Sequence, residues 1–161
     1  MDTYKVKAQP LSEQVFKPYG IYIKPGDRVY PAGDAEAGEM RLAVGAIAPQ
    51  FNLNRLDRLA VRFEFNQTIA VLSGTLILVL APPPSNPQAP PEKYTLDYQR
   101  LAAFILNPGD FIQFERGSWF LLEPIGGEGK IVWSSPRKGL PDDSEYVNLT
   151  QRGAAPIEVV L

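Results

Sequence analysis

The sequence predicts an all-β fold, a barrel or sandwich of short strands with one short helix near the start. The chain has 13 glycines and 16 prolines among 161 residues, which disfavours long helices and supplies many turns. Short apolar runs recur, most of them bounded by glycine, proline or asparagine. Three such runs lie within residues 101–124, separated by two compact turns, and this pattern is typical of a β-meander.

The predicted helix comes first, over residues 11–17. Ser12 is the expected N-cap, because its hydroxyl can accept a backbone N–H of the first turn, and Pro18 ends the helix. Strands are expected where apolar residues alternate or run together between turn signals, at 4–7 (an edge strand), 21–24, 40–48, 59–65, 68–72, 75–80, 94–98, 102–106, 111–115, from 119, 130–134, 146–149 and 157–161.

The remaining segments are predicted to be turns and loops. Ser73-Gly74 is expected to turn a hairpin, and residues 126–129 to form another hairpin turn. Residues 25–39 show no periodicity and are expected to be a loop. The proline-rich segment 82–91 cannot be a central strand, because proline lacks the backbone donor, so an extended loop is expected. A PxxP recognition motif is the alternative for that segment.

Composition limits the partners and the compartment. A net charge of −2 with scattered basic residues gives no surface for nucleic acid or for a membrane. The longest apolar run, residues 69–81, is interrupted and too short to span a bilayer. No basic-then-apolar leader is present, so a cytoplasmic protein is expected. The length predicts a single domain over residues 1–161.

The chain contains no cysteine and no histidine. Disulfides, thiolate nucleophiles and zinc–thiolate sites are therefore excluded. The commonest metal ligand and the side chain that titrates near neutrality are also missing. Acid–base chemistry would have to use carboxylates, lysine, tyrosine or water, and no transition-metal site is expected.

Three segments carry a family resemblance. Residues 101–124 contain a strand, a Pro-Gly-Asp turn, a second strand and Arg-Gly-Ser-Trp at 116–119. Residues 9–20 contain Pro-Leu-Ser and end in Tyr-Gly, and residues 67–74 are a glutamine-led strand that ends in Ser-Gly. In content and order these segments resemble the ureidoglycolate lyase (ureidoglycolate hydrolase) family of the cupin superfamily. The chain departs from that family where it carries Phe120 after the tryptophan, because the family has a histidine there.

The resemblance implies a cupin-type double-stranded β-helix, a jelly-roll barrel with its ligand pocket near one mouth, and a homodimer. The implied activity is cleavage of ureidoglycolate to glyoxylate and urea in allantoin and purine catabolism, by a carbon–nitrogen lyase without cofactor or metal. One alternative is a catalytically inactive cupin that binds a small carboxylate. A structural barrel that mainly forms a dimer is the other.

Four residues are predicted to bind the substrate, namely Arg62, Gln67, Arg116 and Trp119. Arg62 and Glu64 share one face of a predicted strand, at the spacing of the two histidines in the first cupin motif. A surface ion pair is their alternative. Gln67 offers an amide to a ureido or carboxylate group, or is a turn residue. Arg116 can hold a carboxylate by two parallel hydrogen bonds. Trp119 either walls the pocket or lies in the core.

Three glutamates are predicted to transfer protons, namely Glu64, Glu115 and Glu123. The elimination needs one group to remove the hydroxyl proton and another to protonate the departing urea nitrogen. A glutamate beside an aromatic ring has its pKa raised toward neutrality by desolvation. An ordinary surface position is the alternative for Glu115 and Glu123.

Overall fold

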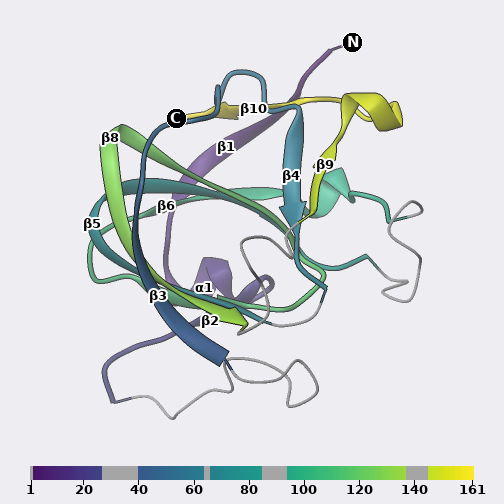
Figure 1. Ribbon diagram of the computed structural model, residues 1–161. Coiled ribbons are helices and arrows are strands. Elements are labelled where there is room, and N and C mark those ends of the chain that lie inside the picture. Colours follow the sequence, from purple (N-terminus) through teal and green to yellow (C-terminus); the bar gives the residue numbers. More distant parts are fainter. Residues whose placement is uncertain (1, 27–39, 64–65, 85–93, 137–144) are drawn as a thin grey trace.

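The computed structural model describes residues 2–26, 40–63, 66–84, 94–136 and 145–161, and these residues form an all-β fold (Figure 1). No helix in these ranges is long and apolar enough to cross a membrane. The elements are β1 (Tyr4–Pro10), α1 (Glu13–Phe16), β2 (Gly20–Tyr22), β3 (Met40–Ile47), β4 (Arg58–Val61), β5 (Gln67–Ala81), η3 (Tyr98–Arg100), β6 (Ala102–Leu106), β7 (Phe111–Phe114), β8 (Trp119–Pro136), β9 (Glu145–Asn148), η4 (Thr150–Arg152) and β10 (Ile157–Val160).

The short predicted helix is confirmed as α1. The Ser12 hydroxyl accepts the Val15 backbone N–H at 3.3 Å, as expected of an N-cap. The helix has one buried residue, Phe16, whose ring meets Phe104 of β6 edge-on at 5.2 Å. The predicted edge strand at the N-terminus is wrong, because β1 lies between β10 and β6 and pairs parallel with each.

β5 is the strand around which the sheet is built, and it is not a hairpin. Its first residues pair with β7 and its last with β6, while β8 pairs along its other side. The register with β8 shifts between Val71 and Thr75, where Gly74 has a φ of +81°. The hairpin predicted at Ser73-Gly74 is therefore wrong, because the glycine lets one continuous strand bend at a bulge.

Two further turn signals lie beside that bend. β8 runs through residues 126–129 as one strand, with positive φ at Gly126 and Gly127, so the predicted hairpin turn is wrong. The turn at 107–110 is confirmed, and its Asp110 oxygen accepts the Val71 N–H at 2.9 Å. However, β6, β7 and β8 each pair with β5 and not with one another, so the predicted meander is wrong.

The aligned bends fold the sheet into two layers. One layer has the order β10-β1-β6-β5-β8-β4-β9, and the other has the order β2-β7-β5-β8-β3. β5 and β8 belong to both layers because they continue through the bend, as Figure 1 shows on the left. Strands that switch layers at a bend close a jelly-roll barrel. The all-β barrel that the sequence predicts is thereby confirmed.

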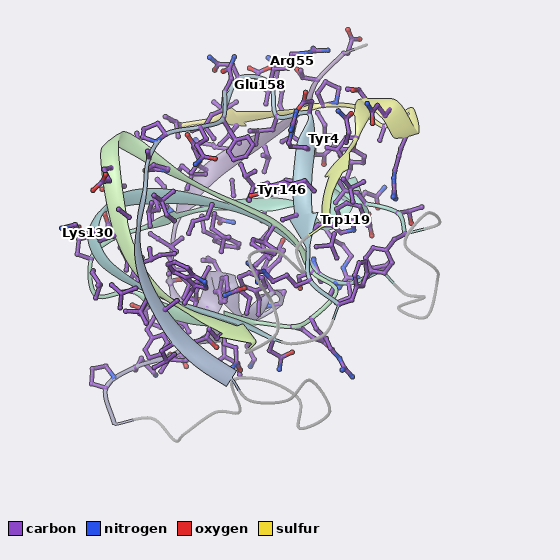
Figure 2. All side chains as sticks on the ribbon, in the orientation of Figure 1. Tyr4, Arg55, Trp119, Lys130, Tyr146 and Glu158 are labelled. Carbon is purple, nitrogen blue, oxygen red and sulfur yellow. The ribbon has the colours of Figure 1, made fainter. Side chains whose placement is uncertain are left out.

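Figure 2 shows side chains on both the inner and the outer side of the strands. In the first layer, side chains on both faces are buried. Leu76, Leu78 and Leu80 of β5 belong to the core between the two layers. Ile77 and Val79 belong to a second core, which β1, β9 and β10 help to cover. Residues 76–81 of β5 therefore form a continuous apolar run in the sequence, because neither face of this part of the strand meets solvent.

Two other local predictions are corrected. The strand expected at 59–65 ends at Val61. Residues 94–98 form no strand, because Tyr94 is 3% exposed in the second core and its hydroxyl donates to the Gly117 oxygen at 2.7 Å. Most of the loops expected at 25–39 and 82–91 lie outside the described residues; Pro82 to Pro84 has no regular structure.

Candidate functional site

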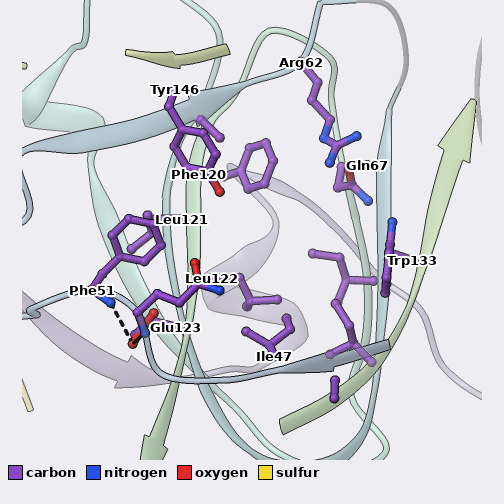
Figure 3. A pocket seen from close by; sticks show the side chains of 15 residues that line it. Ile47, Phe51, Arg62, Gln67, Phe120, Leu121, Leu122, Glu123, Trp133 and Tyr146 are labelled. Atoms are coloured by element: carbon purple, nitrogen blue, oxygen red, sulfur yellow. Dashed lines mark hydrogen bonds between the residues drawn. The ribbon is translucent and has the colours of Figure 1, made fainter. Parts of the chain in front are cut away.

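A cavity of about 240 Å³ lies on the inner face of the bent sheet (Figure 3). Most of its wall is apolar, and a few polar side chains enter it, which is the usual make-up of a small-molecule site. It is lined by Ala46, Ile47, Gln50, Phe51, Ala60, Arg62, Gln67, Ile69, Phe120, Leu121, Leu122, Glu123, Ile131, Trp133 and Tyr146.

Arg62 supplies the positive charge of the cavity. It follows Val61 on the chain and shares the inward side of Ala60, and its backbone oxygen accepts the Gly117 N–H at 2.6 Å. Its guanidinium carbon lies 5.9 Å from the centre of the Phe120 ring. The half-buried cation is therefore held over an aromatic face, where it can meet an anionic ligand.

Gln67 is the most buried polar side chain in the part of the cavity near Arg62. It begins β5 on the same inward face as Ile69, and it is 3% exposed. Its Nε2 donates to the backbone oxygens of Thr68 and Ser134, at 3.2 and 3.3 Å. Its Oε1 accepts no hydrogen bond from any described residue. A buried acceptor left without a donor is a candidate ligand contact.

Glu123 lines the cavity at the opposite side of the view in Figure 3. It is 2% exposed, and its Oε1 accepts the backbone N–H groups of Gln50 and Phe51 at 2.8 and 3.1 Å. Its Oε2 accepts no hydrogen bond within the described ranges. Along β8, Leu122 faces the core between the two layers, whereas Glu123 lies on the other face of the strand together with Leu121 of the second core. Glu123 therefore stands at the margin of the cavity.

Arg116 and Glu115 do not join this group. Both are exposed, and they line a separate hollow of about 860 Å³ that shares no lining residue with the cavity. The Arg116 backbone N–H donates to Asn66 Oδ1 at 3.0 Å. In the same hollow, burial raises the pKa of Tyr94 to about 12, and the nearby Glu115 carboxylate adds to that increase.

Trp119 lies in the second core. It is 1% exposed, its Nε1 donates to the Thr95 oxygen at 3.1 Å, and its ring packs 5.7 Å from that of Tyr94. The structure therefore brings Arg62, Gln67 and Glu123 to one cavity and places Trp119, Glu115 and Arg116 elsewhere. Glu64, the remaining predicted residue, lies outside the described residues.

Sequence reasoning missed the other lining residues, among them Gln50, Phe120, Trp133 and Tyr146. Phe120 could have been found from alternation, because its neighbours Trp119 and Leu121 both face the second core. Tyr146 reaches the cavity through the pairing of β9 with β4, where it lies opposite Ala60. No local signal marks that long-range pairing. Tyr146 is 54% exposed and so stands on the solvent side.

The residues present do not fit a transition-metal site. The chain has neither histidine nor cysteine, and the described residues contain no group of three aspartates or glutamates that could hold a metal ion. The polar cavity atoms are amide, phenol and guanidinium groups with one carboxylate. Such a set suits hydrogen bonding to an organic ligand better than coordination of a soft metal.

No protein-family model matches the sequence, and no curated protein matches it. The resemblance to the ureidoglycolate lyase family therefore stays a prediction.

Solved structures that resemble the chain include oxalate decarboxylase from Bacillus subtilis, at 14% identity over 70% of this chain and 24% of that one, with a TM-score of 0.43. A dTDP sugar isomerase from Desulfovibrio desulfuricans G20 has 15% identity over 78% of this chain and 71% of the isomerase chain, with a TM-score of 0.45. The TDP-quinovose 3,4-ketoisomerase WlaRB from Campylobacter jejuni has 14% identity over 68% of this chain and 71% of the ketoisomerase chain, with a TM-score of 0.41.

The chain spans about a quarter of the length of the oxalate decarboxylase. Similarities of this extent assign no activity, so function has to be argued from the cavity itself.

Proposed function

We propose that the cavity binds a small carboxylate that carries an N–H group, and that it cleaves ureidoglycolate to glyoxylate and urea. One observation supports this above the others: a half-buried arginine lines the same small cavity as Gln67, a buried glutamine whose Oε1 accepts no hydrogen bond from the described residues. Arg62 would bind the carboxylate through charge-assisted hydrogen bonds, and Gln67 Oε1 would accept a ureido N–H. Ureidoglycolate carries both groups on the same carbon atom.

The cleavage would need one proton to move. The hydroxyl proton leaves as the carbonyl of glyoxylate forms, the carbon–nitrogen bond breaks, and the departing urea nitrogen gains a proton. Glu123 is the carboxylate among the described residues that lines the cavity, so the proposal gives it this transfer. Its Oε1 is held by two backbone N–H groups, which leaves Oε2 to carry the proton.

A binding protein without turnover is the second candidate. It is favoured by the position of Glu123 at the margin of the cavity and by its role in anchoring the backbone of Gln50 and Phe51. On that reading Arg62 and Gln67 hold the carboxylate, and no proton is transferred.

The test is glyoxylate release from ureidoglycolate by the purified protein, with a chelator present and with the uncatalysed decay subtracted. Glu123→Gln keeps an oxygen for the two backbone N–H groups but removes the proton carrier, so kcat should fall by about a hundredfold or more. Glu128→Gln, an exposed glutamate on the same strand, is the matched control and should be unchanged. A wild-type rate equal to the blank would leave the binding protein as the better account.

The proposal includes a cytoplasmic homodimer, as the resemblance implies. Its support is an apolar row on the outer face of the second layer, in which Val44, Val132, Ala70 and Phe111 lie opposite one another on successive strands. Val44 is 69% exposed, which is unusual for the solvent face of an antiparallel sheet. Sedimentation of the wild type and of Val44→Lys tests this pairing; two monomers would contradict it.

A further inference from the structure

The hollow of about 860 Å³ gathers positive charge from three separate parts of the chain. Lys17 follows α1, Arg100 ends η3, and Arg116 lies in the turn between β7 and β8. Among the described residues that line the hollow, Glu115 is the one acidic side chain. Three cations and one carboxylate give these residues a net charge of +2, whereas the whole chain carries −2. The hollow is therefore a local concentration of positive charge on an acidic protein.

Hydrogen bonds between separate segments hold the walls of this hollow in place. Arg100 Nη1 donates to the Pro83 oxygen, just beyond the end of β5, at 3.4 Å. The Tyr94 hydroxyl donates to the Gly117 oxygen at 2.7 Å. A Cβ added at Gly117 would lie 2.5 Å from that hydroxyl, so the contact leaves no space for a side chain. A ligand would thus meet a surface that is already formed, which lowers the entropic cost of binding.

Tyr19 brings a hydroxyl close to one of the cations. It is half-buried, and its ring packs edge-on against Phe104 at 5.1 Å. Burial raises the pKa of Tyr19, and the positive charge of Arg100 opposes that increase. The hydroxyl is therefore protonated at neutral pH and lies within the field of the guanidinium. It can donate a hydrogen bond to an anion that the guanidinium binds.

We propose that this hollow binds a phosphate monoester through Arg100, Lys17 and Tyr19, at a site separate from the cavity. A phosphate monoester carries a charge of about −1.5 to −2 at pH 7, which matches the net charge of the lining residues. Arginine suits its oxygens because the guanidinium can donate two parallel hydrogen bonds.

The organic part of the ligand would meet the remaining wall. Much of that wall is proline or aromatic, namely Pro18, Pro82, Pro83, Pro84, Phe63 and Tyr94. Rigid apolar surface beside a few polar groups is the usual make-up of a small-molecule site. The inference does not depend on the proposed function, because the hollow and the cavity share no lining residue.

The experiment compares two probes by isothermal titration calorimetry at low ionic strength. Phenyl phosphate and phenyl sulfate have nearly the same shape, but the sulfate ester carries a single negative charge at neutral pH. Wild-type protein should bind phenyl phosphate at least about fivefold more tightly, because its additional charge interacts with the same cations. Added salt should weaken that binding.

Four single variants locate the site. Arg100→Met should raise the dissociation constant of phenyl phosphate at least about fivefold, and Lys17→Met, an exposed side chain, about threefold. Arg55→Met is the matched control, because Arg55 is exposed and does not line the hollow; the change should stay below about twofold. Arg62→Met removes the cation of the cavity and should also leave this affinity unchanged. Thermal melting checks that each variant folds.

Equal affinity of the wild type for the two probes, binding of neither, or an unchanged dissociation constant in Arg100→Met would each overturn the inference. Weaker binding in Arg62→Met but not in Arg100→Met would place the probe in the cavity and would overturn it as well. Failure of glyoxylate release would bear on the proposed function alone, since neither probe is a substrate for that cleavage.

Discussion

Replacement of Arg62 by methionine should remove carboxylate binding from the cavity. The guanidinium is half-buried and lies over the Phe120 ring at 5.9 Å, so its hydrogen bonds to an anion would be formed away from bulk water. A hydrogen bond to a charged group contributes about 1.5–3 kcal/mol. One such bond corresponds to an increase of about 10- to 150-fold in the dissociation constant. Arg62→Lys should recover part of the loss, since an ammonium keeps the charge but not the two parallel bonds.

The assay is calorimetric titration with hydantoate (N-carbamoylglycine), with Arg116→Met as the matched variant. Arg116 is exposed and lines the separate hollow, so its replacement should change the affinity by less than about twofold, as is usual for solvent-exposed charges. Thermal melting of both variants checks that each still folds. The reasoning would be refuted if Arg116→Met weakened binding while Arg62→Met did not, because the carboxylate would then bind in the other hollow.

Three further predictions concern stability. Burial raises the pKa of Tyr94 to about 12, so its stabilising contribution is complete below pH 10, where the phenol of the unfolded chain is neutral. That contribution is lost as the pH rises toward 12. Tyr94→Phe should therefore flatten the fall in melting temperature between pH 10 and 12, and an unchanged slope would contradict the prediction. Gly74→Ala should lower the free energy of unfolding, measured by urea denaturation, by at least about 1–2 kcal/mol, because φ is +81° and an added Cβ would lie 2.9 Å from the Gly129 Cα. Gly126→Ala, where φ is also positive but no atom is close, should lower it less. Equal losses of stability in the two variants would argue against the close approach at Gly74. Ser12→Ala should lower the stability by about 1 kcal/mol through loss of the helix cap, and a variant as stable as the wild type would show that α1 does not depend on it.

The strands and the short helix could be predicted from local pattern, whereas their connection could not. Three places in the sequence have the composition of tight turns, namely Gly74, residues 107–110 and the glycines at 126 and 127. In the structure they are three neighbouring bends of one folded sheet, and only the turn at 107–110 has the local geometry that its sequence suggests. Positive φ is required equally by a hairpin turn and by a bulge, so composition alone cannot separate them. The distinction lies in pairing between residues far apart in the sequence.

The candidate site was predictable where side chains alternate along one strand. Arg62 faces the cavity from the same side as Ala60, as the alternation of residues 59–65 indicates. Gln67 was suggested by its place at the head of an apolar strand. Arg116 was suggested by residue type, since a guanidinium suits a carboxylate, but residue type does not say which of several hollows a side chain lines. That depends on how the turn at 115–118 leaves β7.

The same turn sets the place of Phe120, the residue that stands where the resemblance predicts a histidine. The Ser118 N–H donates to the Glu115 oxygen at 3.2 Å, and β8 then begins with Trp119 in the second core. Strict alternation puts the next residue, Phe120, into the cavity beneath Arg62. The position where the resemblance predicts a histidine therefore lines the cavity, and here it holds a phenylalanine ring that lies 5.9 Å from the Arg62 guanidinium carbon. Positive charge comes to the cavity from Arg62, and on the function proposed above it would serve to bind an anion through hydrogen bonds.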